Sequence, residues 1–249
     1  MSVSPLDPLI RKLEYRRPFS SADRAALLAL PYEVKTIEAG AYIVRDGTKP
    51  TRACLVVSGF TFRHKIVAEG ARQILSLNMR GDLVDFQSSF LGIADHNVQA
   101  LTRSEVAYIP RDALRNIAFE RPVIGEALWH DSLVDASIFC EWIANVGRRD
   151  SRTRLAHLLC EFSLRLEAAG LGDHKAWELP MTQEQLADVV GLTPVHVNRT
   201  LKTLEQDGLI RRNRRAVSVS NWKKLAEAGD FQSSYLHLPE HKLSLLQRA

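Results

Sequence analysis

The sequence contains little of what builds a disulfide-linked or metal-bound scaffold. Its three cysteines, Cys54, Cys140 and Cys160, form no CxxC pair, so neither a disulfide framework nor a zinc site is supported. It also lacks any apolar run approaching ~18 residues, which argues against a membrane-spanning helix. The N-terminal stretch MSVSPLDPLIRKLEYRR has no apolar core of a signal peptide. We therefore expect a soluble cytoplasmic protein with no metal site and no membrane partner.

Catalytic motifs are missing as well. The sequence has no GxGxxG and no P-loop. His130, Asp131 and Ser132 are adjacent, but successive helical residues point about 100° apart, so these three side chains cannot converge as a triad. We expect no enzyme activity.

The sequence does have a large apolar content and a mild excess of positive charge. Of its 249 residues, 45% are hydrophobic and 25% are charged, so the chain can bury a sizeable core in one large or two ordinary domains. The net charge is +4 and the pI about 9.0. This basicity permits a nucleic-acid partner without requiring one.

The first half of the chain changes from helical to strand patterns. Residues 6–30 predict two short helices, with Ser20 and Asp23 as a variant capping box and Pro31 as the stop. Residues 32–109 contain short β-rich segments bounded by Gly, Pro or Asp. Many short strands in about 80 residues favour an antiparallel roll or barrel, so we predict an α+β protein.

A long helix is predicted over residues 121–147. Four apolar residues recur on it at helical spacing: Ala127, Val134, Ile138 and Trp142. Further apolar residues fill the neighbouring faces, so the helix needs more than one partner surface. The roll can cover one side and a second copy of the helix the other; the alternative is a helix buried within a monomer. Gly147 breaks the pattern as a candidate hinge, and another helix follows over residues 151–168.

The stretch MTQEQLADVVGLTPVHVNRTLKTLEQ predicts two short helices joined by a glycine turn. Thr182 and Gln185 form a capping box, and Gly191 falls where the turn needs a positive φ. Thr193 caps the second helix, and Pro194 takes its first position, where a missing N–H costs nothing. Two helices in this arrangement are a helix-turn-helix.

The second of these helices has two distinct faces. Its buried side is predicted to consist of Val197, Leu201 and Leu204. The outward side is predicted to carry Val195, His196, Asn198, Arg199 and Lys202. Because the second helix of a helix-turn-helix enters the major groove, we predict double-stranded DNA as a partner.

The following stretch, GLIRRNRRAVSVS, has the pattern of a strand, a tight turn and a second strand, and resembles the wing of a winged helix. Residues 199–215 hold six Lys or Arg against two acids, a local balance of +4. A solvated basic face would show the same charge, but the preceding helix-turn-helix favours a DNA-binding face.

Together these features resemble the Crp/Fnr family of bacterial transcription regulators. The resemblance rests on the order of elements and on TQEQLADVVGLTPVHVNRTLKTLEQDGLI, and it covers about residues 32–220. It implies a cyclic-nucleotide-binding-type β-roll (a double-stranded β-helix), a long dimerisation helix and a C-terminal winged helix-turn-helix. It also implies a homodimer on two-fold symmetric promoter sites, with RNA polymerase as a partner if the protein is an activator.

The resemblance predicts four segments. Residues 1–119 hold the N-terminal helices and the sensor roll, and residues 120–148 the dimerisation helix. Residues 149–222 form the DNA-binding domain, and residues 223–249 a tail to which we assign no function.

The resemblance also assigns DNA contacts to matching positions. The family's base-reading positions match Pro194, Val195 and Arg199, of which only Arg199 can bind guanine O6 and N7 bidentately. Pro194 has no side-chain donor, and Val195 can touch a thymine methyl. With neighbours that can compensate, the expected base-reading set is Val195, His196, Asn198 and Arg199. The expected phosphate contacts are Gln183, Thr193, Lys202, Arg212 and Arg214.

The sensor roll departs from the family's cyclic-nucleotide cassette. In that cassette an acid after glycine takes the ribose hydroxyl, and an Arg-Ser pair takes the cyclic phosphate. Gly81-Asp82-Leu83 matches its start, but Asp95-His96-Asn97 stands where the Arg-Ser pair would be, and a carboxylate repels a phosphate. We therefore expect an effector other than cAMP. The candidate pocket residues are Arg72, Gly81, Asp82, Leu83, His96 and Asn97.

No cofactor is predicted, and the effector is unknown. The family's oxygen-sensing branch uses an N-terminal cysteine cluster, whereas the first cysteine here is Cys54, which excludes that iron–sulfur mechanism. Eight histidines leave haem open. Three hypotheses remain: an effector-controlled transcription factor, a regulator with an effector-free roll controlled by abundance or a protein partner, and, remotely, a small-molecule-binding enzyme.

Overall fold

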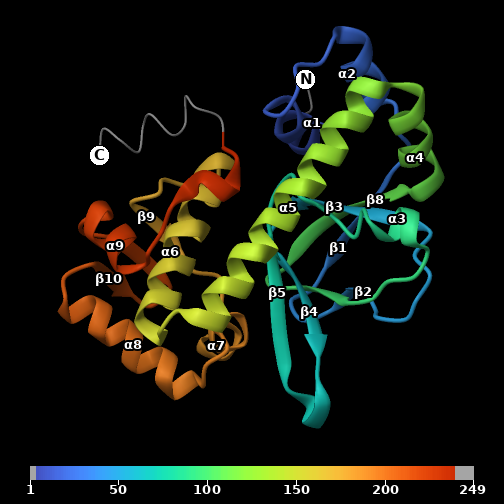
Figure 1. The fold of residues 1–249 in the computed structure, drawn as a ribbon. Helices are drawn as coiled ribbons and strands as arrows, with labels where there is room; N and C mark the ends of the chain where they lie inside the picture. The colour runs from blue at the N-terminus through green and yellow to red at the C-terminus, as the bar shows by residue number, and fades with distance from the viewer. Residues whose placement is uncertain (1–3, 239–249) are drawn as a thin grey trace. The chain divides into compact units, whose positions relative to one another are not determined.

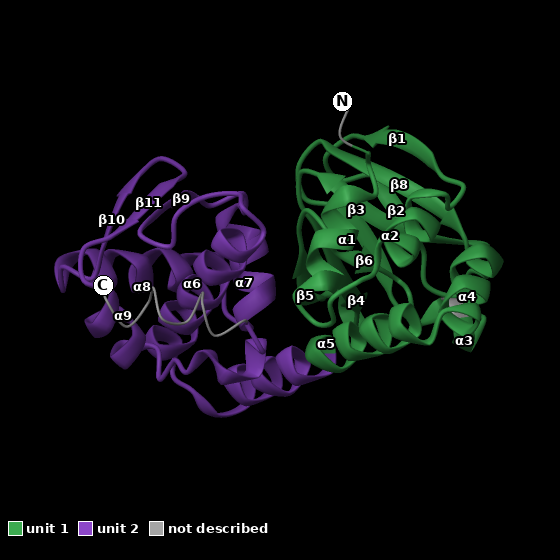
Figure 2. Cartoon of the chain, turned by 90° about the horizontal axis from the view of Figure 1, so that it is seen from above, with its two compact units in different colours: residues 1–135 green, residues 136–249 purple. Residues whose placement is uncertain are grey.

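The computed structural model describes residues 4–238, apart from the side chain of Ser89. The chain divides into two compact units, residues 1–135 and 136–249, and the division falls inside the long helix α5 (Pro122–Arg148) (Figures 1 and 2). Of the tail expected at residues 223–249, the part beyond Leu238 lies outside the described residues.

Unit 1 begins with two helices, α1 (Asp7–Glu14) and α2 (Ser21–Leu28). The predicted capping box is present at α2. The Asp23 amide donates to the Ser20 hydroxyl (3.2 Å), and the Asp23 carboxylate accepts from the Ser20 amide (3.2 Å). Local sequence signals therefore fixed the start of this helix correctly.

Eight short strands follow and pair antiparallel in two four-stranded sheets. One sheet has the order β1-β8-β3-β6 and the other β2-β7-β4-β5, which confirms the antiparallel roll. The strands are β1 (Glu33–Ile37), β2 (Tyr42–Val44), β3 (Arg52–Ser58), β4 (Thr61–Ile66), β5 (Arg72–Asn78), β6 (Leu83–Val84), β7 (Asn97–Ala100) and β8 (Ser104–Pro110). A short turn, η1 (Ala68–Gly70), joins β4 to β5, and α3 (Ser88–Leu91) follows β6.

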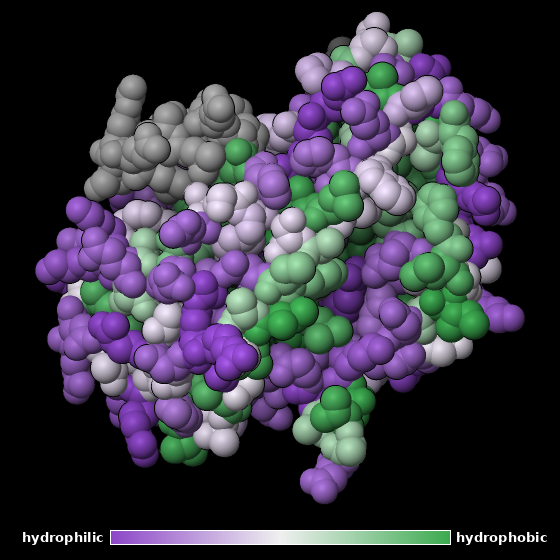
Figure 3. Space-filling view, viewed as in Figure 1, coloured by the Kyte–Doolittle hydropathy of each residue, from purple (hydrophilic) through white to green (hydrophobic). Residues whose placement is uncertain are grey.

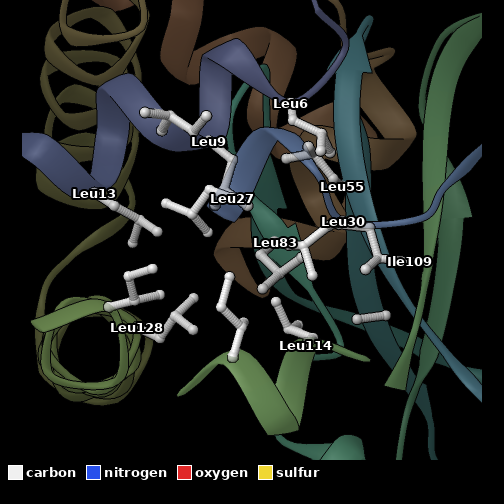
Figure 4. Packing of buried hydrophobic residues seen from close by; sticks show 14 of the residues in the cluster. Leu6, Leu9, Leu13, Leu27, Leu30, Leu55, Leu83, Ile109, Leu114 and Leu128 are labelled. Atoms are coloured by element: carbon white, nitrogen blue, oxygen red, sulfur yellow. The ribbon is translucent and has the colours of Figure 1, made fainter. Parts of the chain in front are cut away.

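The alternation of strand residues divides the core of unit 1 into two layers. In β3, Cys54 and Val56 belong to a cluster between the two sheets, whereas Ala53 and Leu55 point the other way. The second layer joins the sheet to the helices, and Figure 4 shows Leu55 among leucines of α1, α2 and the later helices. The first turns of α5 complete this layer with Ile124, Ala127 and Leu128, so the sequence order α1–roll–α5 is held by one apolar cluster.

Helix α4 (Arg111–Glu120) turns directly into α5. Gly125 permits the turn, because a Cβ there would lie 2.3 Å from the Ala118 carbonyl oxygen. The predicted long helix is present, but the break expected at Gly147 is wrong: the helix continues through Gly147 to Arg148. The stop comes instead from Asp150, which caps α6 (Ser151–Ala168) by accepting from the Thr153 amide (2.8 Å).

Unit 2 contains the part of α5 from residue 136, then α6 and a small domain of helices and strands. Its elements are β9 (Ala176–Glu178), α7 (Gln183–Val190), α8 (Pro194–Gln206), β10 (Ile210–Asn213), β11 (Ala216–Val219), α9 (Trp222–Ala228) and η2 (Ser233–Leu236). The three strands form one antiparallel sheet in the order β10-β11-β9. Helix α6 packs against α7, α8 and α9, so it is the central support of this domain.

Candidate functional site

The start of each helix in the α7–α8 pair is set by side-chain caps. At α7 the Gln185 amide donates to the Thr182 hydroxyl (3.2 Å), and the Gln185 side chain accepts from the Thr182 amide (2.9 Å). Gly191 takes φ +64 in the turn, and the Thr193 hydroxyl accepts from the His196 amide (3.3 Å) at the start of α8. The predicted helix-turn-helix geometry is therefore confirmed, including its turn residue.

The two faces of α8 are also as predicted. Val197, Leu201 and Leu204 are buried. Val195 is 72% exposed, Asn198 is half-buried, and the other outward residues, His196, Arg199 and Lys202, are exposed. A buried apolar face holds the helix on the domain while its N-terminal half offers polar and cationic side chains to solvent. This arrangement suits a helix that enters a DNA groove.

The two predicted phosphate contacts at helix starts are exposed. Gln183 is the first residue of α7, and Thr193 is the cap of α8. Backbone N–H groups at helix N-termini attract anions, so both positions are suited to a phosphate.

The wing is a hairpin of β10 and β11 with Arg214 and Arg215 in its two-residue turn. The register pairs Asn213 with Ala216, and Arg214 takes φ +55. Arg214, Arg215 and Arg211 are exposed, so the hairpin presents cations at its tip and along one edge. Arg211 and Arg215 were missed from the sequence, although strand alternation points Arg211 away from the buried Ile210.

Arg212 is a correction within the predicted phosphate set. Its Nη2 donates to Glu205 Oε2 of α8 at 2.7 Å, and its side chain is only 19% exposed. In strand β10 it lies on the same side as the buried Ile210, so it ties the wing to α8. The Arg212 guanidinium is therefore engaged within the domain, whereas the Arg214 side chain is exposed.

The residues of the candidate effector pocket make contacts within unit 1. Asp82 Oδ2 accepts from the Met79 amide (2.8 Å), and its Oδ1 lies 2.9 Å from Lys12 Nζ of α1. Leu83 belongs to the apolar cluster with α1 and α5. Gly81 takes φ +92, and a Cβ there would lie 3.0 Å from the Pro8 carbonyl oxygen. The fold itself therefore uses the Gly81-Asp82-Leu83 segment to seat α1.

Two further pocket residues have roles in the roll wall. The Arg72 guanidinium lies 5.5 Å from the Phe62 ring centroid. The Asn97 side chain accepts from the Asp46 amide (3.1 Å). Both contacts hold the ends of strands in place, and neither indicates which ligand would bind.

His96, the sixth residue, lies in a buried polar cluster of the roll. Its Nδ1 is 2.6 Å from Asp95 Oδ1 and its Nε2 is 3.6 Å from Asp85 Oδ1. Asp85 has φ +62, a strained value for a residue with a side chain, and its Oδ1 accepts from the Ser88 hydroxyl. Burial, with the nearby Arg63 charge, lowers the pKa of His96, and burial raises the pKa of Asp85.

Arg63 was not found from the sequence, yet it faces the interior of the roll. In the β4–β7 register it lies opposite Val98, which belongs to the cluster between the sheets. With the Gln87 amide turned so that its oxygen faces Arg63, both terminal guanidinium nitrogens donate to it at 3.1 Å. Burial lowers the pKa of Arg63. The sequence carries no signal for this arginine, because Thr61, Phe62, Arg63 and His64 are all buried and β4 shows no alternation of buried and exposed residues.

The predicted dimer face of α5 needs a correction. Ala127, Val134, Ile138 and Trp142 are each 7% exposed or less in the single chain. Ala127 packs with α1 and the roll, and Trp142 Nε1 donates to Glu161 Oε2 of α6 (2.8 Å). These four side chains are already buried in the single chain, so they do not form an exposed face for a second copy.

A different face of α5 is exposed and apolar. Trp129, Leu133 and Ile143 are 68%, 53% and 73% exposed, and Ala136 and Cys140 between them are exposed too. Their spacings of four, three, four and three residues are those of a coiled-coil seam. Figure 3 shows hydrophobic atoms along the course of α5.

A buried polar network joins α5, α6 and the segment after α9 within unit 2. His157 lies between the Gly229 carbonyl (3.0 Å) and the Tyr235 hydroxyl (3.0 Å), and Tyr235 donates to Glu161 (2.9 Å). Gly229 touches the backbone of α6 so closely that a Cβ there would lie 2.7 Å from the His157 nitrogen. The first part of the unassigned tail is thus packed onto α6.

Two further observations concern metals and membranes. Within residues 4–238, no group of three or more His, Cys, Asp or Glu side chains gathers as a metal site. No helix in that range combines the length and apolar character needed to cross a membrane.

Both halves of the chain match known families. Residues 34–121 match the family described as Cyclic nucleotide-binding domain, and residues 153–228 match the Crp-like helix-turn-helix domain. A Probable transcriptional activator of Rhizobium leguminosarum bv. viciae is 28% identical over 177 residues, covering 71% of this chain and 72% of that protein. Transcriptional activator protein FnrL of Cereibacter sphaeroides is 27% identical over 215 residues, covering 84% and 86%.

The solved structure of FixK2 from Bradyrhizobium japonicum has the same fold, with a TM-score of 0.73 and 21% identity over 80% of this chain and 98% of that one. A roll of this type, a long helix and a winged helix-turn-helix with an exposed basic face define a DNA-binding transcription regulator. The chain belongs to the Crp/Fnr family.

Proposed function

We propose that this regulator acts as a homodimer, paired through the exposed seam of α5, that reads a two-fold symmetric DNA site with α8. The observation that carries the proposal is the division of α8 into a buried apolar face and an exposed face with Val195, His196 and Arg199. Asn198 at the edge of that face joins the base-reading set. Lys202 and Arg214, with Gln183 and Thr193 at helix starts, are proposed to hold phosphates.

The seam supplies the second half of the proposal. Trp129, Leu133, Ala136, Cys140 and Ile143 form one stripe on α5, and an exposed stripe of this kind is stabilised by burial against another helix. In a two-fold pair of parallel helices each of these residues faces its own copy. Dimers of this kind are typical of the family, and they place two α8 helices on one duplex.

The roll is proposed to work without cAMP. The Asp82 carboxylate is paired with Lys12 and the Met79 amide, and these contacts compete with a ribose hydroxyl for its oxygens. The carboxylates of Asp85 and Asp95 beside His96 would repel a cyclic phosphate.

The remaining parts of the proposal concern setting. We place the regulator in the cytoplasm, with RNA polymerase as partner if it activates transcription, and with regulation rather than catalysis as its activity. The division proposed for the chain is residues 1–119, 120–148, 149–222 and 223–249. Control by abundance or by a protein partner is the second candidate, and the captive Asp82 favours it.

Binding-site selection from random duplexes tests the proposal. The expected result is a two-fold symmetric consensus whose half-sites lie about one helical turn, ~34 Å, apart. Affinity for it should fall steeply with salt, because phosphate contacts release counterions. Recovery of no consensus, or of a single asymmetric half-site bound by one chain, would overturn the dimeric reading of DNA. Saturable binding of cAMP in calorimetry would refute the statement about the roll.

A further inference from the structure

The end of α1 makes an ion junction between the roll and α5. Lys12 Nζ lies 2.9 Å from Asp82 Oδ1 of the roll and 2.7 Å from Asp131 Oδ2 of α5. The three side chains are 24%, 14% and 11% exposed. Arg16 stands behind them, with its Nε 4.0 Å from Asp131 Oδ1. One ammonium group therefore connects three elements that are far apart in the sequence.

The surroundings of this junction are apolar. Leu9, Ile10 and Leu13 of α1 lie in one cluster with Leu83 of the roll and Leu128 of α5. In such surroundings opposite charges attract each other strongly. Removing one partner costs much free energy, because the other charge is left buried and unpaired. Burial by itself lowers the pKa of Lys12, but the carboxylates of Asp131 and Asp82 outweigh it, so the net shift of this pKa is upward.

The junction also fixes the rotation of α5. Asp131 is two residues from Trp129 and two from Leu133, so it points about 200° away from both along a helix of 100° per residue. With Asp131 held by Lys12, the seam residues Trp129 and Leu133 face away from α1. The ion pair adds a directional contact to the apolar packing of α5, and a rotation that separated Asp131 from Lys12 would leave both charges unpaired.

A second basic side chain acts on the same stretch of α5 from inside the roll. Asp135 follows Asp131 by one helical turn, and Arg63 is the buried arginine that Gln87 holds. Asp135 loses solvent on folding, which raises its pKa, and the charges of Lys12 and Arg63 partly oppose that rise. The charges of Lys12 and Arg63 therefore both favour the ionised form of Asp135.

We propose that Lys12 of α1 is a built-in effector: through Asp82 and Asp131 it fixes α5 against the roll and sets the DNA-binding state without a small molecule. In this role the Lys12 ammonium, and not an outside ligand, pairs with the Asp82 carboxylate of the roll. The inference rests on the proposed function for its DNA readout, but the geometry of the junction can be tested without DNA.

The test compares Lys12→Met, which keeps an unbranched side chain one atom shorter and removes its charge, with Arg17→Met. Arg17 is a matched control, because it pairs with Glu126 of α5 at 3.3 Å in the same region, but the two side chains are 53% and 59% exposed. Lys12→Met should weaken binding to the selected DNA site by about tenfold or more, and Arg17→Met by less than about twofold. Lys12→Arg, which retains a cation, should restore most of the affinity.

Hydrogen–deuterium exchange gives the readout that needs no DNA. The α5 amides of residues 122–135 should exchange faster in Lys12→Met than in Arg17→Met. If Lys12→Met is too unstable to purify, Asp131→Asn, which leaves Lys12 an oxygen to bind, should shift both readouts in the same direction by a smaller amount. Wild-type exchange and wild-type affinity in the Lys12→Met and Asp131→Asn variants would overturn the proposal.

Refolding tests whether the effector is built in. Wild-type protein unfolded in guanidinium and refolded in ligand-free buffer should recover its full DNA affinity. A loss that a heat-treated, protein-free cell extract restores would show that a diffusible molecule is required, and would overturn the proposal. If wild-type protein selects no DNA at all, the proposed function fails, while the exchange comparison still decides the junction.

Discussion

Arg199 and Arg214 are both exposed cations of unit 2, but they have different supports. Arg199 stands on α8, six residues beyond the Thr193 cap, on the side opposite Val197 and Leu201. Arg214 stands in a two-residue hairpin turn with φ +55. A rigid helix can present a guanidinium to a base edge at a fixed angle, whereas a turn at a hairpin tip is better suited to a phosphate, which accepts contacts from many directions.

Replacing Arg199 with alanine should therefore change specificity, and replacing Arg214 should change affinity alone. Arg199→Ala should cost about 1–3 kcal/mol per half-site and relax the preference at one base pair. Arg214→Ala should weaken all sequences alike and reduce the log–log salt slope by roughly 0.9 per lost phosphate contact. Binding-site selection with each variant at two salt concentrations measures both effects.

Arg212→Ala is the control on the same hairpin. Since Arg212 is held by Glu205, its loss should lower the melting temperature of the protein. It should change the salt slope of DNA binding only slightly. Unchanged base preference in Arg199→Ala would show that another face of α8 reads the DNA. A changed preference in Arg214→Ala would show that the wing reads sequence.

Helix α5 has one face that is buried in its own chain and one exposed apolar face, which we propose for pairing. Ile138 is 6% exposed and Ile143 is 73% exposed, although both are isoleucines on the same helix. Ile143→Asp should dissociate the dimer while leaving the chain folded, because the charge then sits in solvent. Ile138→Asp should instead unfold or strongly destabilise the chain, because it buries a charge without a partner. Sedimentation and thermal melting together separate the two outcomes. A folded dimer in the Ile143→Asp variant would show that the chains do not pair through the seam.

The seam can be tested in the unmodified chain as well, because Cys140 lies within it. Cys140 is exposed, whereas Cys54 and Cys160 are buried and burial raises the pKa of both of those thiols. A copper–phenanthroline oxidant, which takes up two electrons as two thiols form a disulfide, should give a covalent dimer through Cys140. Cys140→Ser should give none. A covalent dimer that persists in the serine variant would point to another contact between copies.

The tail segment on α6 gives a third test at this scale. Gly229→Ala places a methyl group against the backbone of His157, so we expect a loss of about 1–3 kcal/mol in the free energy of unfolding. Gly147→Ala is the matched control, since nothing lies within 4 Å of a Cβ there and alanine favours a helix by up to about 1 kcal/mol. Denaturant unfolding of the two variants should move in opposite directions, and equal midpoints would show that the tail does not pack closely.

These elements show which features the sequence could reveal. The sequence could predict the α7–α8 pair because its signals are local. Thr182 and Thr193 each cap a helix by a contact three residues along the chain, and Gly191 forms the turn. The choice of face on α5 was not, because a helix that is apolar on several sides has no periodicity that tells its own core from a partner. The capture of Asp82 by Lys12 was also hidden, since it joins residues that only the folded chain brings together.

For the whole molecule, buried histidines predict a loss of stability in mild acid. Burial lowers the pKa of His157, and it lowers the pKa of His96, where Arg63 adds to the effect. The unfolded chain has ordinary histidine pKa values near 6.5, so below that pH it takes up protons that the folded protein refuses. The free energy of unfolding should therefore be highest above about pH 6.5 and fall below it, by up to about 1.4 kcal/mol per pH unit for each histidine.

Denaturant unfolding between pH 5 and pH 7.5 measures this slope. His157→Gln should reduce the slope by up to about 1.4 kcal/mol per pH unit, the effect of one proton. This holds whatever the variant does to stability at pH 7.5. A slope that is the same in His157→Gln and wild type would mean that His157 is protonated in the fold, held by Glu161 and Glu141 around it.

The seam of α5 has a consequence for how such a regulator responds to its own supply. When most chains are single, the number of pairs grows with the square of the chain concentration, so a twofold rise in synthesis gives up to about a fourfold rise in occupied promoters. The small side chains of Ala136 and Cys140 in the middle of the stripe bury less surface than leucine would, which weakens pairing and favours this regime. Substitutions at these two positions would then move the threshold of gene dosage at which the promoter switches, without altering the DNA sequence that is read.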